Sequence, residues 1–143
     1  MDFDWNSFGI EKRSPVATRT IFYVQEALGV EFPESYIDLL KYANEAVPEI
    51  SSFPICAQEA TCVSEFFTFL PTPAPYSVLW YSRPNCIDGL PEKFLPIARD
   101  AGAYLICLNF EIEPASIEAF DTNSKAIFYI SDSFEAFVNL WSE

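Results

Sequence analysis

The stretch FLPIARDAGAYLICLNF, residues 94–110, decides the fold class of this chain of 143 residues. Two apolar runs, 94–98 and 104–110, flank turn residues at 99–102, a pattern that predicts a strand, a turn and a second strand. The second run is almost wholly apolar, so we expect its strand to be covered on both faces or to lie deep in a sheet. An antiparallel pair is therefore predicted at the centre of the fold.

Three further segments alternate apolar and polar residues closely enough to be strands. They are residues 62–70, which end where a run of prolines begins at Pro71, and residues 116–120 and 126–130, which flank a polar turn at 121–124. We expect residues 45–60 to form a loop. Residues 76–81 fit a short helix and a short strand equally well.

Two helices are predicted ahead of the strands. In the first, Ser14 is the N-cap, Pro15 takes the first helical position and Gly29 ends the helix. The second begins at Pro33 and ends near Asn44, a residue type that tolerates a left-handed cap. One face of each helix is apolar, formed by Ala17, Ile21, Val24 and Leu28 in the first and by Tyr36, Leu39, Leu40 and Ala43 in the second.

A final helix is predicted to start at Asp132, whose carboxylate caps it while Glu135, three residues on, completes a capping box. Its inward stripe consists of Phe134, Phe137, Val138 and Trp141.

The order of two helices, several antiparallel strands and one helix predicts an α+β fold. We expect a single domain over residues 1–143, mainly an antiparallel sheet packed with helices. Residues 1–14 have no regular pattern, but three apolar side chains in them are available to pack back on the domain, namely Trp5, Phe8 and Ile10.

The composition narrows the function classes. Half of the residues are hydrophobic and 17% are aromatic, which excludes an intrinsically disordered chain. The formal net charge of −13 argues against nucleic acid or an anionic membrane as partner, because phosphate contacts need cations, and favours a neutral or basic partner. The chain has no His, which removes the commonest general base and the commonest transition-metal ligand.

The first residues are acidic where a secretory leader needs positive charge, and no apolar run is long enough to span a membrane. We therefore expect no signal peptide and a cytoplasmic location. The cysteines have no Cys-x-x-Cys spacing, so we expect buried, reduced thiols, with a zinc site or a Cys56–Cys62 disulfide as alternatives.

Three motifs in order resemble one family. Residues 28–36 (LGVEFPESY), running on to Asn44, resemble the opening helical pair of the SUKH superfamily, the immunity proteins related to the fungal cell-wall-synthesis regulator family. Residues 90–108 (LPEKFLPIARDAGAYLICL) resemble its central hairpin, although the turn in that family is typically richer in glycine. Residues 130–137 (ISDSFEAF) resemble its terminal strand and helix.

This resemblance implies a SUKH-like fold without catalytic activity. Bacterial members of the family typically bind and neutralise a cognate toxin, often a nuclease, and eukaryotic members serve as interaction modules. We therefore expect a non-enzymatic immunity protein without metal or cofactor, whose partner is a basic protein toxin. The alternative is a SUKH-like interaction module that is not linked to a toxin.

The acidic residues gather in two regions, with a net charge of −7 over residues 26–65 and of −6 over residues 111–143. An acidic surface can be steered onto the basic active surface of a toxin that acts on nucleic acid. The first candidate partner-binding set flanks a strand and its turn and consists of Glu111, Glu113, Glu118 and Asp121. The second lies in the expected loop after the second helix and consists of Glu45, Glu49 and Glu59.

Glu111 and Glu113, two residues apart, face the same way if that segment is extended. Two other interpretations of the acids remain open. They can form a solvated surface that keeps the chain soluble, in which case the interface is an apolar patch around Trp80 and Tyr81. They can also serve an enzyme, but the sequence has no calcium-binding loop, phosphate-binding glycine loop or nucleophile elbow, which disfavours that class.

Overall fold

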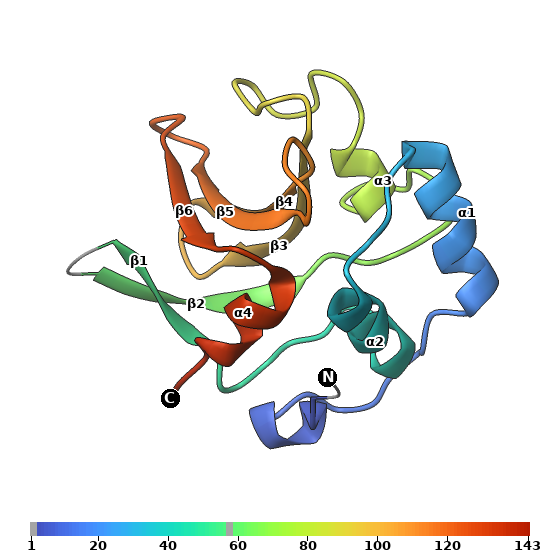
Figure 1. The fold of residues 1–143 in the computed structure, drawn as a ribbon, viewed down its shortest axis with the longest axis horizontal. Coiled ribbons are helices and arrows are strands. Elements are labelled where there is room, and N and C mark those ends of the chain that lie inside the picture. The colour runs from blue at the N-terminus through green and yellow to red at the C-terminus, as the bar shows by residue number, and fades with distance from the viewer. Residues whose placement is uncertain (1–2, 57–58) are drawn as a thin grey trace.

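The strands form one six-stranded antiparallel meander in the order β1-β2-β3-β4-β5-β6 (Figure 1). They are β1 (Ser52–Cys56), β2 (Glu59–Phe66), β3 (Phe94–Asp100), β4 (Tyr104–Asn109), β5 (Ser116–Asp121) and β6 (Ile127–Ser131). The sheet curls until β1 and β6 approach each other, so that it is nearly closed (Figure 1). This computed structural model describes residues 3–56 and 59–143; residues 1–2 of the expected irregular segment and 57–58 of the expected loop lie outside it.

Helices precede, interrupt and follow the sheet. They are a 3₁₀ helix η1 (Trp5–Phe8), then α1 (Thr18–Leu28), α2 (Glu34–Tyr42), the short α3 (Val78–Tyr81) and α4 (Phe134–Asn139). α4 packs on β5, β6 and α2, and α3 packs on β3 (Figure 1). The predicted α+β class, an antiparallel sheet packed with helices, is confirmed. None of the described helices is long and apolar enough to cross a membrane.

The central hairpin confirms the prediction made from residues 94–110. β4 pairs with β3 on one side and β5 on the other, and its residues from Leu105 to Asn109 are all buried, as expected for a strand covered on both faces. The turn begins later than predicted, because Arg99 and Asp100 still pair with β2. The buried Asp100 carboxylate then closes the turn by accepting hydrogen bonds from the backbone N–H of Gly102 (2.8 Å) and Tyr104 (3.0 Å).

The expected loop over residues 45–60 is wrong, because it contains β1 and the start of β2. β1 has the alternating burial of a strand, with Phe53 and Ile55 buried and Pro54 between them exposed. Proline cannot donate to a ladder and is confined to edge strands, and β1 is an edge strand. The predicted strand over 62–70 is correspondingly displaced: β2 ends at Phe66.

The predicted start of the first helix is also wrong. α1 begins at Thr18 with Ala17 as its N-cap, and no side chain caps it. Backbone hydrogen bonds hold the preceding segment away from helical geometry: Val16 N–H donates to the Leu40 carbonyl (2.9 Å), and Arg13 N–H donates to that of Tyr42 (3.3 Å). Tertiary pairing with the end of α2 therefore overrides the Ser14-Pro15 signal.

The other two predicted caps are each displaced by one residue. Ser133, not Asp132, is the N-cap of α4, and its hydroxyl accepts a hydrogen bond from Ala136 N–H (3.0 Å). The Asp132 carboxylate instead accepts a hydrogen bond from the Tyr129 hydroxyl. At the end of α2 the C-cap is Ala43 in an extended conformation (φ −153°), not Asn44 in a left-handed one, and the left-handed residue is Glu45 in the turn that follows (φ 56°).

The core is built largely from aromatic rings. All four residues of the predicted stripe of the last helix are buried, although α4 ends at Asn139 and Trp141 lies beyond it; the Phe137 ring packs against Phe53 with a centroid distance of 4.9 Å. The expected packing of the N-terminal segment on the domain is confirmed, since Trp5 and Ile10 are buried and the Phe8 ring lies edge-on to Trp141 at 5.2 Å. The first and last segments of the described chain are thus in direct contact.

Trp141→Ala should lower the free energy of unfolding by roughly 3 to 5 kcal/mol, the usual result of truncating a core aromatic side chain. The indole packs against Phe8, Phe66 and Phe137, and the substitution leaves a cavity among these rings. Urea unfolding followed by far-ultraviolet circular dichroism measures the effect. Leu140→Ala, at the neighbouring and exposed position, is the control and should change stability little; an unchanged midpoint for Trp141→Ala would contradict the packing.

Tyr36 and Tyr42 offer a matched pair of tyrosine hydroxyls. Burial raises the pKa of Tyr36, whose hydroxyl has no hydrogen-bond partner among the described residues, whereas the Tyr42 hydroxyl donates to the Ile10 carbonyl (3.1 Å). Tyr36→Phe should leave the free energy of unfolding unchanged or raise it by up to about 1 kcal/mol, and Tyr42→Phe should lower it by about 1 kcal/mol. Denaturant unfolding of both variants measures these free energies. A larger loss of stability for Tyr36→Phe than for Tyr42→Phe would show that the Tyr36 hydroxyl makes a hydrogen bond.

Candidate functional site

A groove of about 1230 Å³ is lined by Ser82, by Ser133 and mainly by three parts of the chain. These are α1 with its connection to α2, residues 92–95 where β3 begins, and residues 110–115 of the connection from β4 to β5. Small-molecule pockets usually have volumes of about 300 to 1,000 Å³, so the groove is better matched to a segment of a macromolecule.

The first side of the groove is shaped by the end of α1. Gly29 ends that helix as predicted, in the left-handed conformation (φ 68°) that favours glycine. Gln25 then anchors the connection: its backbone carbonyl accepts from Val30 N–H (3.1 Å), and its side-chain oxygen accepts from Phe32 N–H (2.7 Å). As a result Phe32 is buried while Glu31 beside it is exposed.

The other side is held by bonds at the end of β4. Phe110 N–H donates to the Lys93 carbonyl (2.9 Å), and Glu111 N–H donates to the Asn109 side chain (2.9 Å). The rings of Phe32 and Phe110 meet edge to face at 6.3 Å. This aromatic contact joins the two sides of the groove, so acids far apart in the sequence line one depression.

Carboxylates dominate the polar lining of this groove. Five line it, all on exposed residues: Glu26, Glu31, Glu92, Glu111 and Glu113. Lys93 is the one basic residue among the lining residues. Within the described part of the chain none of the five is in an ion pair, since the pairs found are Arg99–Glu65 and Lys125–Asp88. We call this site the acidic groove.

The structure divides the first predicted set of acids. Glu111 and Glu113 lie together in the acidic groove, although their segment forms a turn and a bend and is not extended. Glu118 is partly buried and its carboxylate accepts hydrogen bonds from the Asn109 amide (2.6 Å) and the Ser116 hydroxyl (2.7 Å). Glu118 therefore supports the sheet at the β4–β5 pair.

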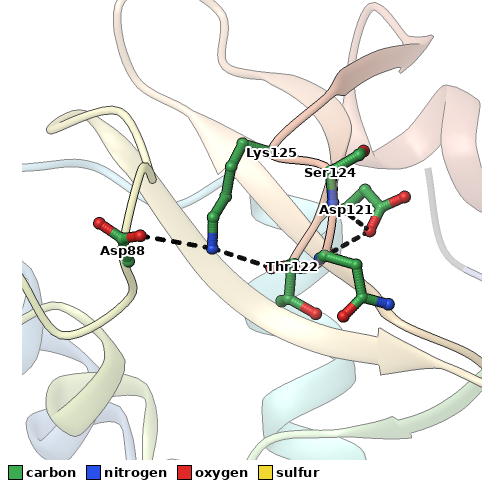
Figure 2. A network of polar contacts seen from close by, with 6 residues as sticks. Asp88, Asp121, Thr122, Ser124 and Lys125 are labelled. Atoms are coloured by element: carbon green, nitrogen blue, oxygen red, sulfur yellow. Dashed lines mark hydrogen bonds and ion pairs between the residues drawn. The ribbon is translucent and has the colours of Figure 1, made fainter.

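Asp121 also makes internal contacts. Its carboxylate accepts hydrogen bonds from the backbone N–H of Asn123 (2.8 Å) and Ser124 (3.2 Å), which hold the turn before β6 (Figure 2). In the same turn the Lys125 ammonium donates to the Thr122 carbonyl (2.9 Å) and pairs with Asp88 at 3.6 Å (Figure 2). The backbone hydrogen bonds lower the pKa of Asp121.

The second predicted set is not brought together. Glu45 and Glu49 lie in the connection from α2 to β1, whereas Glu59 begins β2 and pairs with Cys56 at the end of β1. Glu49 packs tightly against the N-terminal segment: a Cβ added at Gly9 would lie 2.6 Å from the Cβ of Glu49. All three acids are exposed, and none of them lines the acidic groove.

Three of the groove acids were not singled out from the sequence. The net charge of −7 over residues 26–65 included Glu26 and Glu31, but no local pattern linked them to Glu111. Glu92 lies in a region whose charges balance. Two contacts between residues far apart in the sequence bring these acids together: the rings of Phe32 and Phe110 join the two sides of the groove, and the hydrogen bond from Phe110 N–H to the Lys93 carbonyl holds the segment of Glu92 next to that of Glu111.

Comparison with known proteins agrees with the fold and its motif order. The family model described as SMI1 / KNR4 family (SUKH-1) matches residues 15–140. The chain belongs to this family. No curated protein matches it. Family membership supports an immunity protein or an SMI1/KNR4-like module.

The aromatic residues considered as an alternative interface lie elsewhere in this SUKH-1 fold. The Tyr81 ring is half-buried and stacks on the buried Phe67 ring at 4.3 Å. The Trp80 ring has the Arg83 guanidinium over it at 4.8 Å from the ring centroid. Neither residue lines the acidic groove.

The cysteines are free, but the expectation that they are all buried is wrong. Cys107 is buried, which raises the pKa of its thiol, whereas Cys56 is exposed and Cys62 and Cys86 are partly exposed. The alternative Cys56–Cys62 disulfide is also wrong: Cys62 pairs with Ser52, so the two thiols are out of register along the β1–β2 hairpin. In residues 3–56 and 59–143, no three Cys, Asp or Glu side chains are grouped to hold a metal ion.

The lowered pKa of Asp121 predicts a pH-dependent contribution to stability. A carboxylate whose pKa is lower in the folded state stabilises the fold above its unfolded pKa, about 3.9, and loses that contribution as the pH falls through the folded value. Asp121→Ala should therefore lower the melting temperature near neutral pH, with a difference from the parent that shrinks below about pH 4.

Thermal melts across this pH range measure the effect. Asp88→Ala, which removes the exposed partner of Lys125, is the control and should show little difference at any pH. A constant difference for Asp121→Ala down to the lowest pH would mean that the ionised carboxylate does not hold the turn.

Proposed function

We propose that this SUKH-1 protein is a non-enzymatic immunity protein that binds and neutralises a cognate bacterial toxin. The toxin is a basic protein of the nuclease type, and neutralisation occurs by charge-complementary occlusion of its active surface. The acidic groove is the centre of the contact. Glu111 and Glu113 come from the β4–β5 connection, Glu26 and Glu31 from α1 and its connection to α2, and Glu92 from the segment that leads into β3.

One observation carries this proposal: five exposed carboxylates from separate parts of the chain line one groove with a single lysine. Exposed acids contribute little to folding, so their convergence is not needed for stability. It creates a concentrated negative potential, which raises the association rate of a basic partner and opposes the binding of nucleic acid. A nuclease holds its substrate with cations, and a protein that pairs with those cations blocks the phosphate-binding surface.

Charge reversal within the groove tests this proposal. The triple variant Glu26→Lys, Glu111→Lys, Glu113→Lys should slow association with the cognate toxin by about tenfold or more, because steering contributes at least that factor. It should also abolish protection of cells that express the toxin. Stopped-flow association at two salt concentrations and a growth assay measure both effects; the parent's association should slow as salt screens the charges over about 8 Å.

The second predicted set supplies a control of equal charge. Glu45→Lys, Glu49→Lys, Glu59→Lys changes the net charge by the same amount at exposed positions outside the groove. This variant should still protect cells, and both variants should keep the parent's thermal midpoint closely. Full protection by the groove variant, together with salt-independent association, would show that the acids only keep the protein soluble.

A further inference from the structure

The acidic groove also contains exposed apolar side chains. Phe22 of α1 is 60% exposed and Ile112 of the β4–β5 connection is 50% exposed, and both line it. Single exposed apolar residues are ordinary, but these two come from segments far apart in the sequence and converge on one depression. Water covers both side chains in the free protein, so a partner that covers them gains hydrophobic stabilisation.

Apolar surface inside a charged border is the arrangement of a protein-binding site. The partly buried side chains of Leu28, Val30 and Phe110 also line the groove. Glu31 follows Val30 in the chain, and Glu111 follows Phe110. Interfaces between proteins commonly have an apolar centre and a polar rim. The occupant must therefore satisfy both kinds of surface at once.

These two requirements define the chemistry of the occupant. A purely cationic segment would leave Phe22 and Ile112 in water, and an apolar segment without charge would leave the carboxylates without partners. A second copy of this chain, with its net charge of −13, would be repelled by the groove. A basic segment with apolar side chains at its centre satisfies the whole site.

We propose that the acidic groove binds an exposed segment of the partner in which aromatic or aliphatic side chains are flanked by lysine or arginine. This inference rests on the proposed function and specifies which part of the basic partner the groove holds. The apolar side chains cover Phe22 and Ile112, and the flanking cations pair with the carboxylates on both sides. The groove thereby selects among basic proteins, which charge alone cannot do.

Peptide binding to the full chain tests this inference. The probe is the fluorescein-labelled peptide Lys-Arg-Phe-Leu-Arg-Lys, compared by fluorescence anisotropy with the equally charged Lys-Arg-Ser-Ser-Arg-Lys. The first peptide should bind about tenfold more tightly, since partial burial of two apolar side chains is worth at least that factor. Equal affinity of the two peptides, or binding of neither, would overturn the inference.

Phe22→Ser and Ile112→Ser locate the effect in the groove. Each should remove most of the preference for the apolar peptide while leaving the weaker binding of the serine peptide unchanged. Tyr23→Ser is the matched control, because Tyr23 is the next residue of α1, is 58% exposed and does not line the groove. A preference that survives both groove variants, or is lost equally in Tyr23→Ser, would place the apolar contact elsewhere and overturn the inference.

The outcomes separate this inference from the proposed function. If the groove charge variant fails to protect cells but neither peptide is preferred, the toxin docks at the groove by charge, and the apolar part of the inference is wrong. If the apolar peptide is preferred but the charge variant still protects, the groove binds such segments and the proposed toxin contact is wrong.

Discussion

Burial of β4 on both of its faces is the constraint on which the rest of the structure depends. The strand is too apolar to leave either face in water, so the chain must cover it twice. The sheet curls until β1 approaches β6, and α4 packs on β5, β6 and α2 to complete a core shared by all these elements. Because β4 itself is covered, the chain reaches solvent again in the connection that follows it. Residues 110–115 of this connection line the groove.

The carboxylates of this protein have different environments, which the net charge does not distinguish. Asp100 and Asp121 accept backbone hydrogen bonds in turns, and Glu118 accepts bonds from two side chains on the sheet. The carboxylates of the groove make no ion pair within the described residues and face solvent. The proposed function therefore assigns recognition to a minority of the acids, and other acids, such as Asp100, Glu118 and Asp121, hold turns or the sheet by internal hydrogen bonds.

The sequence was most informative where periodicity and core burial agree. The central hairpin, the stripe of α4 and the end of α1 at Gly29 could all be predicted, because each depends on local pattern or on the conformational freedom of glycine. The family resemblance added the fold. Prediction failed where distant backbone groups compete with a local signal, as at Ser14, or where a proline breaks the apparent alternation, as at Pro54 in β1.

The candidate site was only partly predictable for a related reason. Glu111 and Glu113 were identified from their neighbourhood in the sequence. Glu26 and Glu31 join them through the packing of Phe32 on Phe110, and Glu92 joins them through the hydrogen bond between the backbones of Phe110 and Lys93. Glu118 and Asp121 were grouped with them because they flank the same strand and its turn, and the sequence does not distinguish a carboxylate that accepts internal hydrogen bonds from a free one. Distinguishing the two requires the positions of their donors.

The contact between Phe8 and Trp141 makes the ends of the described chain mechanically dependent on each other. A segment that packs only on its sequence neighbours can fray alone, but η1 packs on Trp141, two residues beyond the end of α4, and Ser52 of β1 forms a backbone bridge with Ser142. Pulling either end from the domain therefore removes a support of the other. The free energy needed to unfold the C-terminal segment locally therefore depends in part on residues of the N-terminal segment.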